Sequence, residues 1–189
     1  MNLRKMHRKL APILFAPLLL TAITGVAYRI GRSWFGLSSE FGNFILLLHE
    51  GRFLGKPIVP IYVLFLGLGL LGMIISGMTL IKQRKKIDSP NSPKLNERRL
   101  HQLIALIGFL PFAVSAITGI AYRLGRAWLN WSDEQAEIFL KIHQGAYLGS
   151  ALKPFYVLLV GTSLMIMLLT GIQMSGVMRK KRSQPSDIS

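Results

Sequence analysis

The chain contains no cysteine and only eight acidic residues among its 189. The missing cysteine excludes disulfides, cysteine-ligated iron–sulfur clusters and covalently attached c-type haem, which needs a C-x-x-C-H segment. Any metal chemistry in this chain must therefore use histidine, carboxylate or thioether ligands. The scarcity of acids leaves a formal net charge of +15, and the placement of that charge limits what the protein can do.

Charge is also missing from four long stretches of the sequence. Uncharged, mostly apolar runs of 19 or more residues cover 10–28, 58–81, 103–122 and 154–178. A helix needs about 20 apolar residues to cross a hydrocarbon core about 30 Å thick. Buried helices of soluble proteins are rarely so long and so free of charge. The sequence therefore predicts an all-α membrane protein with four transmembrane helices.

The basic residues are distributed unequally around these four runs. Fifteen of the 23 Lys and Arg residues precede the first run, lie between the second and third, or follow the fourth. The other eight share the opposite side with five of the eight acids. The positive-inside rule then places both termini and the middle loop in the cytoplasm, and residues 29–56 and 123–153 outside. Because topology accounts for the charge, the expected partner is the lipid bilayer and not a nucleic acid.

The sequence repeats itself after 94 residues. AITGVAYRIGRSW at 22–34 returns as AITGIAYRLGRAW at 116–128, and the same offset aligns 7–80 with 101–174 without a gap. We interpret the chain as two tandem two-helix repeats, 1–81 and 100–178, with a cytoplasmic linker at 82–99 and a disordered cytoplasmic tail at 179–189. Each repeat crosses the membrane twice, so both copies have the same orientation. Parallel repeats of this kind predict a pseudo-two-fold axis along the membrane normal.

The segment after each repeated motif is too short for an independent domain, and the second copy predicts a short helix there. Ser132 and Gln135 have the spacing of a capping box, so a helix is expected to begin near Asp133. Helical periodicity places Ala136 and His143 on its apolar face. The first copy has the equivalent pattern ending at His49.

All four histidines of the chain fall into two matched pairs, His7 with His101 and His49 with His143. The predicted axis places the first pair at one depth near the cytoplasmic face and the second near the outer face. His7 cannot pair with His49, because the span between them is about 28 Å long at ~1.5 Å per residue. A low-spin b-type haem needs two axial ligands on opposite faces of its ring, and neutral imidazole is the usual ligand. The pairs therefore fit two haem b sites, although an interfacial histidine can also meet lipid headgroups.

Four arginines follow the same offset at the expected outer helix ends: Arg29, Arg32, Arg123 and Arg126. A guanidinium group matches the geometry of carboxylates such as haem propionates. The alternative is that these side chains extend to lipid headgroups within an aromatic belt. Both interpretations stay open for Arg32 and Arg126, which we take as candidate cofactor-binding residues whose removal should lower the potential of an outer haem. For Arg29 and Arg123 the headgroup interpretation is favoured.

HRKLAPILFAPLLLTAITG with LLLHEGRFLG, and RLHQLIALIGFLPFAVSAITG with FLKIHQGAYLG, resemble the PepSY-associated transmembrane helix family. The similarity covers nearly all of residues 5–178. Members include four-helix inner-membrane proteins similar to ferric-siderophore reductases, in which histidines hold b-type haems that pass electrons across the membrane. The resemblance implies that His7, His101, His49 and His143 are axial haem ligands. It also implies a multi-pass protein of the bacterial inner membrane, with another energy-transducing membrane left open.

These observations lead to two hypotheses of different class. The first is a transmembrane electron conduit with two bis-histidine haems b, either a b-type cytochrome or the membrane component of a ferric reductase. Electrons would come from an unidentified cytoplasmic-side donor and pass to an external acceptor, with ferric chelates suggested by the resemblance alone. With 189 residues, the chain is expected to contain neither an extracytoplasmic PepSY domain nor a flavin or nicotinamide domain. The second hypothesis is a haem-free scaffold or accessory subunit of a larger membrane complex.

Overall fold

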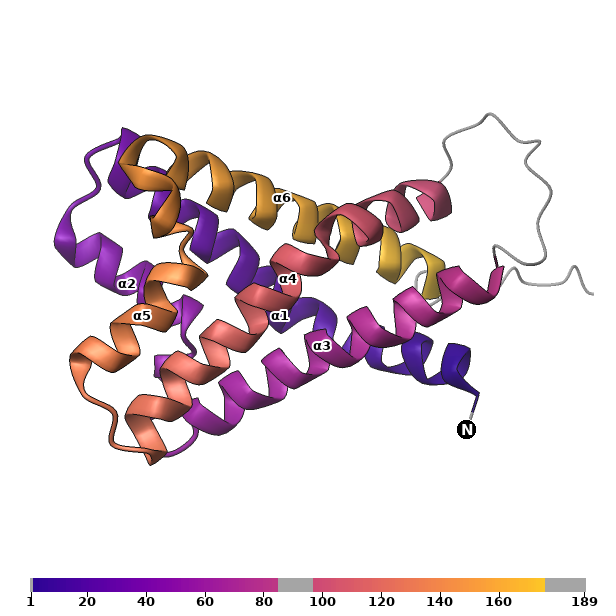
Figure 1. Ribbon diagram of the computed structural model, residues 1–189, viewed down its shortest axis with the longest axis horizontal. Coiled ribbons are helices and arrows are strands. Elements are labelled where there is room, and N and C mark those ends of the chain that lie inside the picture. The colour runs from indigo at the N-terminus through magenta and orange to yellow at the C-terminus, as the bar shows by residue number, and fades with distance from the viewer. Residues whose placement is uncertain (1, 85–96, 176–189) are drawn as a thin grey trace, which may run out of the picture.

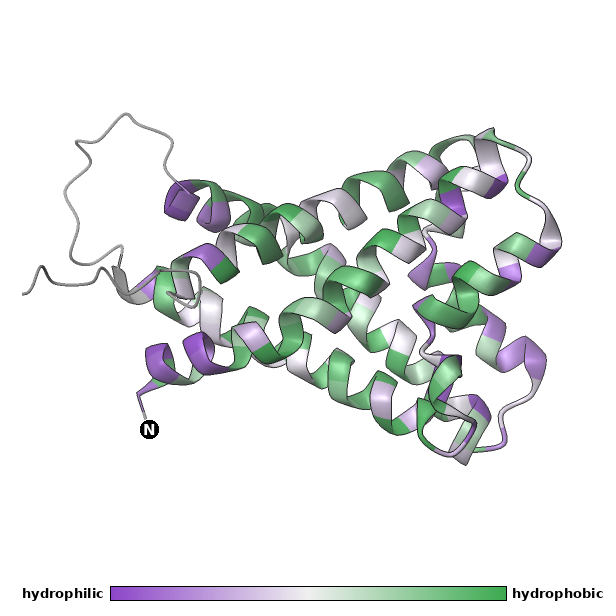
Figure 2. Ribbon diagram, turned by 180° about the vertical axis from the view of Figure 1, so that it is seen from behind, coloured by the Kyte–Doolittle hydropathy of each residue, from purple (hydrophilic) through white to green (hydrophobic). Residues whose placement is uncertain are grey.

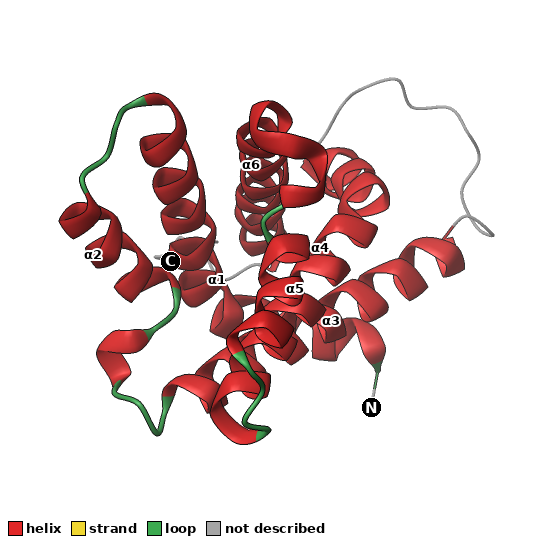
Figure 3. Ribbon diagram, turned by 60° about the vertical axis from the view of Figure 1, so that its left-hand side comes forward, coloured by secondary structure: helices red, strands yellow, loops and turns green. Residues whose placement is uncertain are grey.

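The structure, a computed structural model, describes residues 2–84 and 97–175, and within these ranges the chain is helical without a strand. The described residues form four long helices, with one short helix and short turns between α1 and α3 and again between α4 and α6 (Figures 1 and 3). The long helices are α1 (Leu3–Trp34), α3 (Val59–Arg84), α4 (Glu97–Trp128) and α6 (Gly149–Ser175). The short ones are α2 (Ser39–His49) and α5 (Asp133–His143), followed by the single 3₁₀ turns η1 (Arg52–Leu54) and η2 (Ala146–Leu148). The all-α prediction is confirmed.

The helices extend beyond the uncharged runs that predicted them. α1 and α4 each contain 32 residues, which corresponds to about 48 Å at ~1.5 Å per residue. α3 and α4 continue into the predicted linker from both sides, so that only residues 85–96 of it lie outside the described residues. The predicted tail at 179–189 lies outside them entirely. The charged segments at the helix ends thus keep helical structure through their local propensity. As a result the helices extend past the apolar core of the bilayer.

The four long helices are all apolar enough to cross a membrane. Large apolar side chains project from the bundle, including Ile75, Ile107 and Leu159 with 67%, 75% and 62% of their surface exposed. Exposed apolar patches of this extent are unfavourable in water but not among lipid tails. Figure 2 shows the hydrophobic residues in the middle of the bundle and the hydrophilic residues concentrated towards its ends. The chain is a multi-pass membrane protein.

The helices of the two predicted repeats pack against one another. α1 packs most extensively on α6, and α4 on α3, so the first helix of each repeat lies against the second helix of the other. The contacts within the repeats, α1 with α3 and α4 with α6, also form an equivalent pair. The pseudo-two-fold axis stays a prediction, which these matched contacts support. α2 and α5 lie together at the end of the bundle away from the start of α1 (Figure 1).

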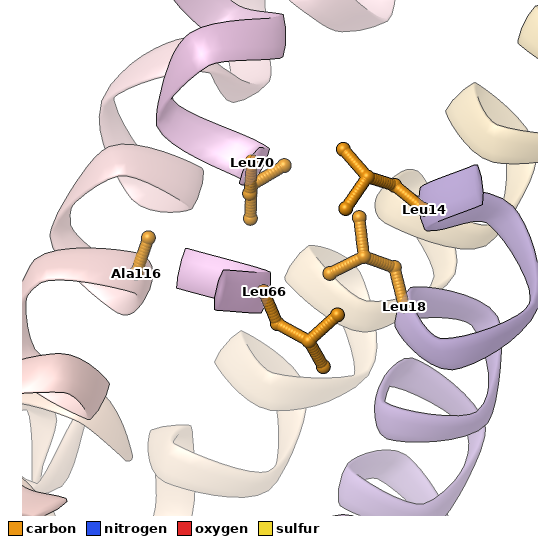
Figure 4. Close-up of a cluster of buried hydrophobic side chains, with 5 residues drawn as sticks. All are labelled: Leu14, Leu18, Leu66, Leu70 and Ala116. Carbon is orange, nitrogen blue, oxygen red and sulfur yellow. The ribbon is translucent and has the colours of Figure 1, made fainter. Parts of the chain in front are cut away.

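A cluster of buried aliphatic side chains fills the middle of the bundle. Leu14 and Leu18 of α1 meet Leu66 and Leu70 of α3, and Ala116 of α4 closes the cluster (Figure 4). Leu14 is 2% exposed. In the chain, Leu14 and Leu18 lie between the cytoplasmic histidine of α1 and the part of α1 that contacts α2. The cluster therefore separates the two levels at which the histidines lie.

Candidate functional site

The outer histidines come together inside the bundle. His49 ends α2 and His143 ends α5. The centroids of the two imidazole rings are 6.4 Å apart, and the ring planes are inclined by 63°. Both side chains are half-buried. The pairing that the sequence predicted for this level thus corresponds to a close approach in the structure.

A glycine two residues after each outer histidine stops its helix. Gly51 and Gly145 have φ values of +70° and +66°, the left-handed conformation that commonly ends helices and that glycine adopts without strain. A Cβ atom at either position would also collide with the ring of Tyr62 or Tyr156. At the start of α5, the predicted capping box of Ser132 and Gln135 is present. The H-x-G motif therefore fixes each histidine as the last residue of a short helix.

Each outer imidazole is bound by the first helix of its own repeat. His49 Nδ1 lies 2.9 Å from the carbonyl oxygen of Thr21, and His143 Nδ1 lies 2.9 Å from that of Ser115. A carbonyl oxygen only accepts hydrogen bonds, so Nδ1 must carry the proton and donate it. Nε2 then keeps its lone pair. This is the tautomer of a histidine that binds a metal through Nε2.

Two glycines provide the space for these rings. A Cβ atom on Gly25 would lie 2.9 Å from Cε1 of His49, and one on Gly119 would lie 3.3 Å from Cε1 of His143. The structure shows that each adjoins an imidazole ring. Gly25 is nine residues before the end of α1 at Trp34. The outer pair therefore lies inward of that helix end.

The environment of the outer pair disfavours the charged imidazolium. Burial lowers the pKa of His49 below its ordinary value of 6.5. Burial, as the larger cause, and the proximity of His49, as the smaller, lower the pKa of His143 to about 4. The hydrogen bond to the carbonyl of Ser115 acts in the opposite direction but is outweighed. Both imidazoles are thus neutral near pH 7, as metal ligation requires.

The lowered pKa of His143 predicts a pH dependence of stability. Between about pH 4 and 6.5 the unfolded chain binds more protons at this residue than the folded chain does, so the free energy of unfolding rises with pH across that window. We expect the melting temperature of cofactor-free protein in detergent to rise more over this window in wild type than in a His143→Gln variant. Differential scanning fluorimetry of both proteins across this pH range measures the melting temperatures. Equal slopes of melting temperature against pH would contradict the prediction.

The other two histidines, His7 of α1 and His101 of α4, are held in an equivalent way by the second helix of their own repeat. His7 Nδ1 lies 2.7 Å from Ser76 Oγ, and His101 Nδ1 lies 3.0 Å from Thr170 Oγ1. The two hydroxyl groups donate their own protons to helix carbonyls, at 2.7 Å and 2.9 Å. They therefore accept a hydrogen bond from Nδ1–H, and Nε2 again keeps its lone pair. Ser76 and Thr170 are 94 positions apart, the same offset that relates the two histidines. This offset could have identified both hydroxyl residues from the sequence once the histidines were known.

His7 and His101 line one cavity of about 380 Å³ near the end of the bundle at which α1 begins. All four long helices contribute to its wall, which is mostly apolar where it includes Leu14 and Leu18 of the buried cluster and Phe112. Gly77 and Gly171 adjoin the two rings, at 3.4 Å and 3.3 Å from a notional Cβ to Cε1. The structure thus brings the predicted cytoplasmic pair to a shared space large enough for a ligand. His143 borders a second, smaller hollow of about 110 Å³.

Arginines that the sequence analysis did not single out lie at the mouth of the larger cavity. Arg4 and Arg98 both line it, each three residues before a cytoplasmic histidine and 94 positions from the other. Arg8 also lines it and donates a hydrogen bond of 3.0 Å to the carbonyl of Ser175. The offset itself was the signal that could have identified Arg4 and Arg98. The cavity therefore combines two imidazoles, apolar walls and a cationic mouth.

The predicted outer arginines contact the turns beside their helix ends. Arg32 donates to the carbonyl of Leu37 at 2.8 Å, and Arg126 forms an ion pair of 2.5 Å with Asp133. Both are exposed, and their role at a cofactor stays a prediction. Arg29 and Arg123, for which headgroup contact was favoured, instead turn towards the other repeat, where they bind Gln144 and Glu50.

The histidines lie in pairs and not in larger clusters of metal-binding side chains. No group of three or more histidine or acidic side chains suited to a metal occurs in the described ranges 2–84 and 97–175. A metal held by two imidazoles needs its other ligands from elsewhere, and a haem macrocycle supplies four nitrogens. Two imidazoles on one metal, with metal–nitrogen bonds of about 2 Å, have ring centroids roughly 6 Å apart. The outer pair at 6.4 Å fits this arrangement.

Comparison with known proteins identifies the family. No curated protein and no solved structure matches the chain. The model of one family, described as the PepSY-associated TM region, matches residues 29–138. That match covers more than half of the chain and contains His49 and His101, whereas His7 and His143 lie on either side of it. The apolar spans, the H-x-G helix ends and this match agree: the chain belongs to the PepSY-associated TM region family.

Proposed function

We propose that this protein is a transmembrane electron conduit that binds two b-type haems, one between His7 and His101 and one between His49 and His143. The observation that carries the proposal is the shared state of the four imidazoles. Each has Nδ1–H committed to an oxygen acceptor and Nε2 left with its lone pair. When bound, haem supplies a one-electron Fe(III)/Fe(II) couple. We further propose an electron donor on the cytoplasmic side and an external acceptor, with ferric chelates as the first candidate.

The residues of the chain would hold and orient the two cofactors. The hydrogen bonds at Nδ1 fix the tautomer and the ring orientation and increase the basicity of Nε2. Gly25, Gly119, Gly77 and Gly171 leave room for the imidazole rings. At the cytoplasmic site, Arg4 and Arg98 offer cations to the propionate groups of a haem whose apolar ring enters the cavity.

The middle of the bundle would keep water and ions out while the two sites operate. Along α1, His7 is 14 residues from Thr21 and 18 from Gly25, the residues that meet His49. At ~1.5 Å per residue this places roughly 21–27 Å between the two levels. Leu14, Leu18, Leu66 and Leu70 fill the space between them. A dry, packed interior of this kind excludes side reactions and strengthens the electrostatic influence of nearby charges.

The direction of transfer depends on topology, which we propose to be both termini in the cytoplasm of a bacterium, with the protein in the inner membrane. The basis is the excess of Lys and Arg at the end of the bundle that holds His7 and His101. Alkaline phosphatase fused after residue 178 is expected to be inactive, and green fluorescent protein fused there to fluoresce. The opposite pair of results would show that the orientation is wrong.

Haem content tests the proposal itself. The protein purified from membranes is expected to be red, with about two haems per chain by pyridine haemochrome assay and a Soret band that shifts on reduction. Colourless protein, prepared from cells supplied with a haem precursor, would contradict haem binding and favour the scaffold hypothesis. One haem per chain would leave only one histidine pair as ligands.

A further inference from the structure

Two equivalent side-chain contacts cross between the repeats beside the outer histidines. Arg29 Nη2 donates a hydrogen bond of 2.6 Å to Gln144 Oε1, and Arg123 bonds to the Glu50 carboxylate. Arg29 and Arg123 are 94 positions apart, as are Glu50 and Gln144. Each contact therefore joins the first helix of one repeat to the residue that directly follows the outer histidine of the other. We refer to these four residues as the outer charge cluster.

The outer charge cluster lies close to the histidine pair. Arg29 is four residues after Gly25 and thus on the same face of α1, one turn further out. Gly25 adjoins the ring of His49. The same spacing links Arg123 to Gly119, which adjoins the ring of His143. The Arg123 side chain is 21% exposed, against 46% for Arg126, so solvent screens the charge of Arg123 less.

One charge makes the two halves of the cluster unequal. Glu50 carries a carboxylate where the other repeat has the neutral Gln144. The carboxylate accepts from Arg123 and also lies 3.3 Å from Nε of Arg52, whose side chain is 43% exposed. Arg29, by contrast, has a neutral partner. The guanidinium of Arg123 is thus compensated by an acid, and that of Arg29 is not.

We propose that the outer charge cluster sets the redox potential of the outer haem, with Arg29 and Arg123 acting more strongly than Arg32 and Arg126. The inference rests on the proposed function, because it requires a haem between His49 and His143. A cation near the ring stabilises the reduced form, whose iron carries one less positive charge. A nearby carboxylate stabilises the oxidised form for the same reason. All four residues contribute to the electrostatic field at the cofactor. They also fix the position of the residue beside each histidine ligand.

Single substitutions separate this electrostatic role from a merely structural one. Glu50→Gln removes an anion and should raise the potential of the outer haem. Arg123→Gln leaves Glu50 without that cation and should lower it, and Arg29→Gln should lower it too. Each change should alter the ratio of reduced to oxidised haem at fixed potential by up to about 15-fold. That is the value for a unit charge roughly 10 Å away at an effective dielectric of about 20. A contact that only stiffens the bundle would give Glu50→Gln and Arg123→Gln the same sign.

The experiment is a spectroelectrochemical titration of purified full-length protein in detergent, with haem content measured on each sample. Lys56→Gln removes an exposed cation from the same side and is expected to leave both potentials unchanged. Arg32→Gln and Arg126→Gln should shift the outer potential less than Arg29→Gln and Arg123→Gln do. Arg123→Lys keeps the charge with different hydrogen-bond geometry, so its potential should lie closer to wild type than that of Arg123→Gln.

The outcomes distinguish this inference from the proposed function. Shifts of opposite sign for Glu50→Gln and Arg123→Gln, with haem content intact, support the outer charge cluster. Equal signs, or larger shifts from Arg32→Gln and Arg126→Gln, overturn it while the haem sites stand. Wild-type protein without an outer haem overturns the proposed function as well. Should Glu50→Gln bind no haem, Arg29→Gln and Arg123→Lys decide: a lowered potential for Arg29→Gln, with Arg123→Lys closer to wild type than Arg123→Gln, supports the inference. An Arg29→Gln potential equal to wild type overturns it.

Discussion

A His101→Ala protein is expected to contain about one haem per chain where wild type contains about two. His101 and His7 line the same cavity from α4 and α1, so removing one imidazole would leave the haem proposed there with a single protein ligand. The outer pair lies roughly 21–27 Å away along α1 and is held by its own hydrogen bonds to Thr21 and Ser115. Pyridine haemochrome assay of protein purified in parallel with wild type gives the ratio, and low-temperature absorption spectra show which haem is lost.

A graded variant strengthens this test. Thr170→Val removes the hydroxyl 3.0 Å from His101 Nδ1 and keeps nearly the same volume, which leaves Nδ1 the carbonyl of Met167 at 3.1 Å. Loss of such a supporting group weakens metal affinity by about 10–100-fold, so the cytoplasmic site should fill only at higher haem concentration. Ser76→Ala should do the same through His7. Two haems per chain in His101→Ala, with wild-type affinity, would show that His101 is not a ligand.

The second large effect is expected in reconstituted liposomes. With reductant inside and an impermeant ferric chelate outside, wild-type protein in the proposed orientation should reduce the chelate, whereas protein-free liposomes should not. A His49→Ala/His143→Ala double variant should fall to the rate of protein-free liposomes, because it has no cofactor site at the outer level. The absorbance of the ferrous product outside the liposomes measures the rate.

The control for this experiment is the state of the cytoplasmic site. The double variant must still hold about one haem that the internal reductant reduces, which shows that the protein is folded and correctly inserted. A Lys56→Gln protein, which alters an exposed residue on the outer side, should retain the wild-type rate. Chelate reduction by the double variant as fast as by wild type would exclude the outer histidines from the route.

Much of this architecture could be predicted without coordinates. Lipid requires every backbone polar group in the hydrocarbon core to be satisfied internally, so a long uncharged run has almost no alternative to a spanning helix. Four such runs therefore predicted four helices. The beginning of α5 at Asp133 was equally local, because the Ser132 and Gln135 side chains bind backbone groups within one turn. Periodicity and capping extend over a few residues, and the sequence displays them directly.

The placement of side chains between helices was not accessible in this way. The sequence favoured headgroup contact for Arg29 and Arg123, yet both contact the residue after an outer histidine of the other repeat. Likewise Arg4 and Arg98 entered the sequence analysis only among the basic residues that predicted the topology. In the structure they line a cavity with His7 and His101. Such contacts depend on how far α2 and α5 enter the bundle and on how the helices of the two repeats cross.

The sequence by itself determined the four spans, the matched spacing of the histidines and the capping box that begins α5, because these follow from composition and from interactions between near neighbours. Tertiary structure alone decided that His49 and His143 approach to 6.4 Å, that Gly25 and Gly119 make room for their rings, and which arginines turn inward. Those features arise where chain segments far apart in sequence meet. Their geometry is set by packing between helices, which a linear pattern does not encode residue by residue.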